Sequence, residues 1–238
     1  MSETIEQRRQ RRFPGQAHVA EGPHDLSNMY AMHHAFRRDL DRFVTAVQRT
    51  PVADRATWQA LRDWWQSYGS VLHHHHSVED VDLWPALKEA VRHAGQEHLL
   101  PTLAAMEAEH ADIDPSLEAC STGFERLATS ADEDARRALE VRIVATRAAL
   151  LRHLEHEETE ALPMTQRHLS AEGWGQLERN AGKAYRPAEL LFLVPWVCDD
   201  VDATTRDELL HEAGLPMRVM LRLGRRKYLR RRRQAFGI

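Results

Sequence analysis

Cysteine is scarce in this chain, with only Cys120 and Cys198 among its 238 residues. Two cysteines provide neither a disulfide framework nor a zinc cluster of several cysteines, which suits a reducing cytosol. Long apolar runs are also missing, because none approaches the roughly 18 residues that a membrane span needs. The first residues carry arginines where a secretion signal would have an apolar core. These absences predict a cytoplasmic protein.

Signals for β-strands are absent too, since no segment alternates apolar and polar residues or concentrates valine, isoleucine and threonine. Apolar residues instead recur every three or four positions over four long segments, at about 25–47, 54–93, 97 into the 120s, and from the turn ATSADEDA to about 168. Pro85 and Pro115 are expected to kink the second and third segments. The sequence therefore predicts an all-α fold, with an antiparallel up-down four-helix bundle over residues 25–168.

The two ends of the chain differ from this pattern. Residues 1–24 are polar, with arginines and several breakers, and predict a flexible arm. Residues 169–238 predict a C-terminal helical extension, which includes the apolar segment ELLFLVPWVC and ends in a basic helix with nine Arg or Lys between 218 and 233. That helix is either a solvated face, neutralised in part by Asp199, Asp200 and Asp202, or a contact for an anionic surface. Its pattern does not favour nucleic acid, and the oligomeric state stays open.

Histidine is abundant, with 15 copies, and some of them stand where a helix normally buries leucine. In HHHHSVEDVDLWP, His75 and Glu79 lie one turn apart on a stripe that is otherwise apolar. In HLEHEETEALP, His153 and Glu157 repeat this arrangement, and in both copies a proline stands ten positions after the histidine. Burying such groups without partners costs several kcal/mol, so the repeat indicates that something compensates them.

Each of the four predicted helices offers one histidine on its apolar stripe, and two glutamates join them. The six candidate metal ligands are His33, His75, Glu79, His110, His153 and Glu157. Imidazole with carboxylate suits iron, manganese or zinc. Two carboxylates from equivalent helices predict two metal ions bridged by Glu79 and Glu157, with two histidines on each. Such ions keep open positions for solvent, an oxo or hydroxo bridge and an exogenous ligand, which favours reactivity.

Several neighbours are candidates for supporting roles. Metal-bound histidines usually donate their second N–H to an acceptor, and the acids near the ligands are Asp80, Glu107, Glu109 and Glu158. His34 is expected on the outward side of its helix. We expect the flanking histidines at the surface or around the ligands, namely His73, His74, His76 and His156. Tyr30 and Tyr68 lie on the apolar stripes and are either core residues or groups that bond a bound oxygen species or ligate iron.

The motifs HHAFRRDL, HHSVEDVDLWP, AEHADID and HLEHEETEALP resemble the hemerythrin-like HHE cation-binding domain over roughly residues 25–168. The resemblance implies an up-down bundle with a non-haem di-iron centre that reacts with O2, peroxide or nitric oxide, ligated by the six residues named above. One position departs from oxygen-carrying hemerythrins, which have a further histidine where this chain has Met106. The pattern is closer to the H-HxxxE-H-HxxxE type of actinobacterial hemerythrin-like proteins, for which peroxide or nitric oxide chemistry is implied.

The sequence leaves several functions open. One hypothesis is a di-iron oxidoreductase that turns over peroxide, nitric oxide or O2, and another is a module that binds O2 reversibly or senses it. Iron buffering and a structural zinc bundle are further alternatives. No organic substrate is indicated.

Overall fold

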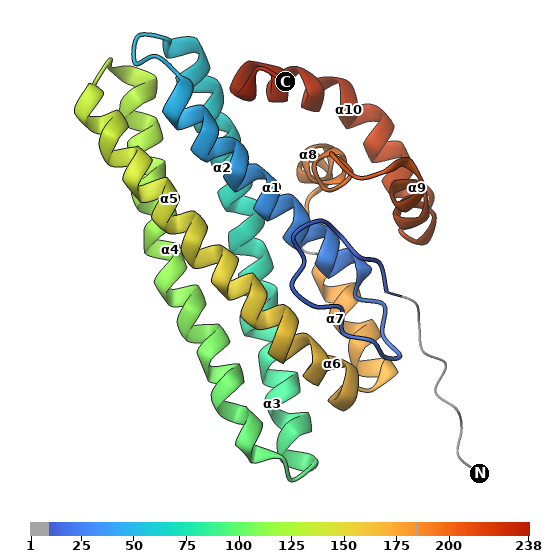
Figure 1. The fold of residues 1–238 in the computed structure, drawn as a ribbon. Coiled ribbons are helices and arrows are strands. Elements are labelled where there is room, and N and C mark those ends of the chain that lie inside the picture. The colour runs from blue at the N-terminus through green and yellow to red at the C-terminus, as the bar shows by residue number, and fades with distance from the viewer. Residues whose placement is uncertain (1–9, 184) are drawn as a thin grey trace.

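The computed structural model describes residues 10–183 and 185–238, whose regular elements are helices (Figure 1). The first nine elements are α1 Ser27–Arg49, α2 Arg55–Val78, η1 Glu79–Leu83, α3 Trp84–His93, η2 Glu97–Leu99, α4 Leu100–Thr129, α5 Glu133–His156, η3 Glu157–Ala161 and α6 Leu162–His168. The C-terminal part adds α7 Ala171–Lys183, α8 Pro187–Val197, α9 Ala203–Glu212 and α10 Gly214–Phe236. The all-helical class predicted from the sequence is confirmed.

A helical bundle is built from α1, from α2 continued by η1 and α3, from α4, and from α5 continued by η3 and α6 (Figure 1). Within it α2 packs on α4, α4 on α5, and α5 on α1. Capping side chains fix two of the helix starts. Asp54 accepts the N–H of Thr57 at 3.1 Å, and Asp132 accepts the N–H of Ala135 at 2.9 Å. Each satisfies an N–H that the first helical turn leaves without a partner.

Both segments that carry a His–Glu pair change to one π-helical turn at the glutamate. η1 begins at Glu79 and η3 at Glu157, and each glutamate carbonyl accepts the N–H five residues later. Pro85 and Pro163 come directly after the residues that donate these N–H groups, Trp84 and Leu162. Because proline has no N–H and crowds the preceding turn, the wider π turn takes up the distortion. The irregularity expected at Pro85 is therefore a π turn, whereas Pro115 lies inside α4 without ending it.

The apolar stripes meet in a core that is rich in aromatic rings. Phe43 lies 4.9 Å from Trp65 and 5.4 Å from Phe124 between ring centroids, and these side chains are essentially inaccessible to solvent. Phe36 extends this packing, with its ring 5.7 Å from Tyr68. Full burial of one such side chain stabilises the fold by about 1.5–3 kcal/mol. The core therefore holds the histidine-bearing parts of the helices in fixed positions.

The C-terminal extension packs on the bundle through α8 and α10 (Figure 1). Trp64 of α2 and Trp196 of α8 both donate their indole N–H to the buried carboxylate of Asp39 in α1, at 2.7 Å each. Gly224 lets α10 approach α8 closely, because a Cβ atom there would lie 2.1 Å from the carbonyl oxygen of Leu191. The extension and the bundle thus share one core.

The basic helix α10 uses only part of its charge for this packing. Three of its arginines bond within the molecule: Arg218 donates to the carbonyl of Leu210, Arg231 donates to the hydroxyl of Ser67, and Arg232 pairs with Asp199. The side chain of Asp199 also accepts the hydroxyl of Tyr228 at 2.9 Å. The other basic residues of α10 are exposed, namely Arg222, Arg225, Arg226, Lys227, Arg230 and Arg233. Contact of this helix with an anionic surface stays a prediction.

The N-terminal segment lies against the bundle from residue 10 onward, while residues 1–9 fall outside the described part of the chain. Phe13 and Ala20 are buried in a cluster with Leu26 and Tyr30. Backbone hydrogen bonds to the bundle hold this segment, which explains why residues 10–24 pack instead of forming the loose arm expected from their polarity. Among the described residues, no helix combines the length and apolar character that a membrane crossing requires.

Candidate metal centre

Four of the six predicted ligands form one compact group inside the bundle. His33 of α1, His75 of α2, Glu79 at the start of η1 and Glu157 at the start of η3 each place one donor atom within 4.8 Å of the others. Nε2 of His33 lies 3.2 Å from Oε2 of Glu157, and Nε2 of His75 lies 3.2 Å from Oε1 of Glu79. All four residues are buried. We refer to them as the carboxylate group.

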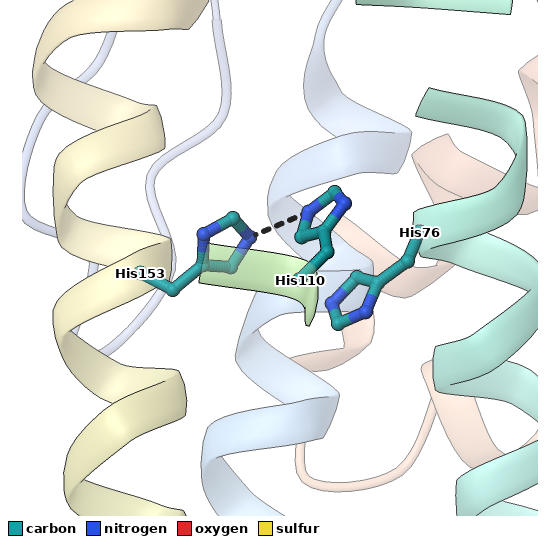
Figure 2. Close-up of side chains that lie close together, drawn as sticks. All are labelled: His76, His110 and His153. Atoms are coloured by element: carbon teal, nitrogen blue, oxygen red, sulfur yellow. Dashed lines mark hydrogen bonds between the residues drawn. The ribbon is translucent and has the colours of Figure 1, made fainter. Parts of the chain in front are cut away.

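The other two predicted ligands belong to a second group, which consists of imidazoles. His110 of α4 and His153 of α5 approach each other with 3.1 Å between their Nε2 atoms, and His76 of α2 joins them (Figure 2). One ring nitrogen from each of the three histidines lies within 4.8 Å of the others. We refer to His76, His110 and His153 as the imidazole group. The structure thus brings all six predicted residues together and adds His76.

Glu79 connects the two groups. Its Oε1 faces His75, whereas its Oε2 lies 3.5 Å from Nε2 of His110. The carboxylate therefore presents one oxygen to each group, which is the arrangement of a ligand shared between two cations.

Buried polar atoms without hydrogen-bond partners concentrate at this place. They are Nε2 of His33, Nε2 of His75, both ring nitrogens of His76, and both carboxylate oxygens of Glu79 and of Glu157. Each such atom costs about 1–3 kcal/mol, and more when it carries charge. Native proteins leave few polar atoms in this state unless a ligand, an ion or water satisfies them. The arrangement of these atoms is therefore typical of a cation-binding site.

Carboxylates around the site hold the outer nitrogen of three rings. Nδ1 of His33 lies 2.9 Å from Glu158, Nδ1 of His110 lies 2.8 Å from Asp80, and that of His153 lies 2.8 Å from Glu109. An Nδ1–H bonded to a carboxylate leaves Nε2 with its lone pair pointing inward. The sequence analysis named these three acids as candidates for orienting ligands, together with Glu107, which instead pairs with Lys88 at 2.6 Å.

Glu158 is the most firmly held of these acids. It is fully buried and binds both terminal nitrogens of Arg37, at 2.7 and 2.9 Å. Its Oε2 also accepts the backbone N–H of Ala17 at 2.7 Å. The N-terminal segment therefore helps to position the ring of His33.

The ionisation of the carboxylate group reflects close packing of acids and an imidazole. Burial opposes a charged ring at His33, but Glu157 and Glu158 outweigh it and raise the pKa of His33 to about 9. Burial, and then the charge of Glu157, raises the pKa of Glu79 well above its ordinary value. Without another cation this group therefore holds protons, which a metal ion would displace.

The other histidines behave in the opposite way. Burial, and then the neighbouring imidazoles, lowers the pKa of His75, His76 and His110. These rings are neutral near pH 7 and keep a lone pair for a cation. A donor set of imidazole and carboxylate without thiolate suits iron, manganese or zinc.

The two candidate tyrosines lie close to this region but bond elsewhere. Tyr30 accepts the N–H of Ala20 at 2.8 Å, and burial raises its pKa to about 12. Tyr68 is fully buried among aromatic rings, and its hydroxyl has no hydrogen-bond partner in the described part of the chain. Phe36 touches both Tyr68 and His75, with its ring 5.2 Å from that of His75. A role for either hydroxyl at the site stays a prediction.

The flanking histidines separate into different environments. His73 is largely exposed, and His156 bonds to Glu109 at 2.7 Å. His34, expected to face outward, is buried and lies against Phe13 with 5.8 Å between the rings, because the N-terminal segment covers it. Tyr185, which the sequence analysis did not single out, lies against His74 with 4.1 Å between the rings.

From the sequence we expected His76 at the surface or around the ligands. In the structure it lies beside two of the predicted ligands, His110 and His153. Successive helical residues point about 100° apart, so a single apolar stripe includes either His75 or His76. In the folded chain His76 faces His110 of α4, whereas the adjacent His75 faces His33 of α1. Both side chains are buried, because α2 also packs on α4. The stripe alone did not reveal the second inward direction.

Comparison with known families supports the same interpretation. The Hemerythrin HHE cation binding domain matches residues 24–165, a range that contains every residue of both groups. Comparisons with curated proteins and with solved structures gave no match. A family match over more than half of the chain, together with a buried His/Glu cluster inside a helical bundle, shows that the chain belongs to the hemerythrin HHE cation-binding domain family.

Proposed function

We propose that this protein is a non-haem di-iron protein of the antiparallel up-down four-helix type, which reacts with a small oxidant such as hydrogen peroxide, nitric oxide or O2. The observation that carries the proposal is the convergence of buried donors without partners in two groups that share Glu79. The proposed ligands include His33, His75, His110, His153 and Glu157 as well as Glu79.

Charge is the first argument for metal ions at this place. Glu79 and Glu157 are both essentially inaccessible to solvent, and the buried guanidinium of Arg37 is already bound to Glu158. Two close carboxylates in a medium of low dielectric constant repel each other strongly unless positive charge lies between them. Divalent ions supply that charge and also satisfy the lone pairs of the inward Nε2 atoms.

The number of ions follows from the division into two groups. The carboxylate group offers four donor atoms that lie within 4.8 Å of one another, and the predicted ligands His110 and His153 of the second group offer two more. A single ion does not reach both groups at metal–ligand distances of about 2.0–2.2 Å. Two ions would use all six of these residues, with Glu79 available to both.

Ferrous iron at this site would supply electrons to a small oxidant, which could bind at the coordination positions that the protein ligands leave open. The chain's own residues control access and orientation. Phe36 lies 5.2 Å from the ring of His75, and Trp84 lies 6.4 Å from that of His110, so apolar rings border both groups. These rings exclude bulk water, while Glu158, Asp80 and Glu109 keep the imidazoles in the required tautomer. Such surroundings favour a small substrate.

An anaerobic titration with ferrous iron tests the proposal, followed by separate addition of peroxide, nitric oxide and O2. We expect about two irons per chain and consumption of at least one oxidant with oxidation of the ferrous iron, observed as loss of the oxidant and a change in the optical spectrum. A protein that binds no transition metal, or binds iron but leaves all three molecules unchanged, contradicts the proposal.

The same titration distinguishes the alternative functions. A spectrum that O2 changes and degassing restores, without consumption of O2, indicates reversible O2 binding or sensing. Uptake and release of iron without either response indicates iron buffering. Preferential retention of zinc in the purified protein indicates a structural metal.

A further inference from the structure

We propose that His76 is a seventh protein ligand of the metal centre, so that three imidazoles bind one of the two ions. This inference rests on the di-iron function proposed above and adds a donor that the His-x-x-x-Glu repeats do not include.

The first observation is that His76 is buried without any hydrogen bond. Its exposed fraction is 2%, and neither Nδ1 nor Nε2 has a partner in the described part of the chain. A histidine that only fills space in a core normally bonds at least one of these nitrogens to a carbonyl, a carboxylate or water. A ring with both nitrogens free and buried is therefore poorly explained by packing alone.

The second observation is that the ring of His76 faces the other imidazoles. It stacks on His110 with 4.0 Å between centroids and 8° between planes, and lies edge-on to His153 at 5.5 Å. Figure 2 shows the three rings converging from different helices. One nitrogen from each falls within 4.8 Å of the others, a spacing that one cation can draw together.

The third observation concerns the nitrogen that points away from the centre. Nδ1 of His76 lies 3.7 Å from Oδ1 of Asp114, and that oxygen also lacks a hydrogen-bond partner. Three other ligand rings have Nδ1 on a carboxylate at 2.8–2.9 Å. A small movement of His76 towards Asp114 gives it the same arrangement, with Nε2 directed inward. Asp114 is then a positioning residue for this ring.

The fourth observation is that α4 supplies only one donor. One turn before His110 stands Met106, which is buried in an apolar cluster with Leu103 and Trp84. Without His76, the ion on this side would have two imidazoles and whatever oxygens the glutamates share with it. His76 restores a third nitrogen from the opposite helix, α2, and makes this side comparable in donor number to the carboxylate group.

The test uses full-length metal-free protein titrated anaerobically with ⁵⁷Fe(II), with iron counted by chelator competition and examined by Mössbauer spectroscopy. The wild type should bind about two irons per chain with two distinct spectral components. His76→Ala should keep one component and lose affinity for the other iron by tenfold or more. Added imidazole should restore the lost component. His93→Ala, which changes an exposed histidine on α3, is the matched control and should behave as the wild type.

His76→Gln provides a variant of similar size should the alanine variant fail to fold, and circular dichroism of the metal-free proteins checks this. X-ray absorption of the iron-loaded wild type gives an answer that needs no variant, because it should count five imidazoles in total over two irons, an average of about 2.5 per iron, instead of four. Two irons with unchanged spectra in a folded His76 variant, or four imidazoles in the wild type, overturn the role of His76 alone. Absence of iron from the wild type overturns the proposed function itself.

Discussion

Both groups of the candidate metal centre draw residues from the two His-x-x-x-Glu repeats, but the groups differ in charge. The carboxylate group combines two imidazoles with Glu79 and Glu157, whereas the imidazole group has no carboxylate of its own. The repeats His75–Glu79 and His153–Glu157 each end in a π turn before a proline. The asymmetry therefore comes from where the other histidines lie. If two ions bind as proposed, the ion at the carboxylate group would be held mainly by charge, and the ion at the imidazole group by nitrogen lone pairs and the shared oxygen of Glu79.

The largest effect on iron binding is expected from a change at Glu79, the residue that faces both groups. Glu79→Gln keeps the shape of the side chain but removes a negative charge that faces His75 and His110. We expect affinity for both irons to fall about 100-fold or more, a loss of roughly 3 kcal/mol. Calorimetric titration measures it. Glu89→Gln, an exposed change on α3, is the control, and retention of two tight ions by Glu79→Gln contradicts the bridging role.

The next largest effect is expected at the acid that supports the carboxylate group. Glu158→Ala leaves the guanidinium of Arg37 buried without its partner and frees Nδ1 of His33. Breaking a buried ion pair in this way typically costs about 3–5 kcal/mol of stability, and loss of the ring's partner should weaken iron binding about 10- to 100-fold. Urea unfolding and iron titration measure the two effects. Glu155→Ala, an exposed change on the same helix, should alter neither.

In the metal-free protein, His33 of the carboxylate group and His76 of the imidazole group should give stability opposite responses to pH. The pKa of His33 is raised from 6.5 to about 9, so its contribution to stability is fully present below about pH 6.5 and is lost as pH rises through 9. The pKa of His76 is lowered, so its effect on stability is lost as pH falls below 6.5. Each response is expected on the order of 1–3 kcal/mol.

Urea unfolding of metal-free protein across this pH range measures both responses. His33→Gln should reduce the alkaline loss, and His76→Gln should reduce the acid loss, to which His75 and His110 also contribute. Stability that stays constant from pH 5 to 9 in the metal-free wild type would show that the two groups do not differ in protonation as the structure implies.

The smallest effect is expected at the acid that supports the imidazole group. Glu109 holds Nδ1 of His153 at 2.8 Å, but its side chain is 32% exposed, in contrast to that of Glu158. Glu109→Ala should therefore cost no more than about 1 kcal/mol of stability and weaken one iron about tenfold. A loss of stability as large as that of Glu158→Ala would show that the two supporting acids are equivalent.

The sequence was sufficient for the helical class and for residues whose positions follow a helical repeat. His33, His75, Glu79, His110, His153 and Glu157 stand on apolar stripes at matching offsets, and the structure brings them together. A stripe reveals one inward direction per helix, so it could not reveal His76, which depends on the packing of α2 against α4.

The parts that the sequence did not reveal depend on contacts between distant segments. Residues 10–24 read as a loose polar arm, yet Ala17 and Ala20 donate backbone N–H groups to Glu158 and Tyr30 of the bundle. Packing of the extension depends on Asp39, which accepts two indole N–H groups from helices far apart in the chain. No local pattern encodes such pairings, since each needs the fold to exist first.

Anomalous diffraction at the iron edge, from crystals of the iron-loaded protein, locates the metal ions directly. We expect two peaks inside the bundle, one among His33, His75 and the glutamates and the other among the imidazole group, with Glu79 bound to both. A single peak, peaks outside these residues, or side chains of Glu79 and Glu157 bonded only to water would contradict it.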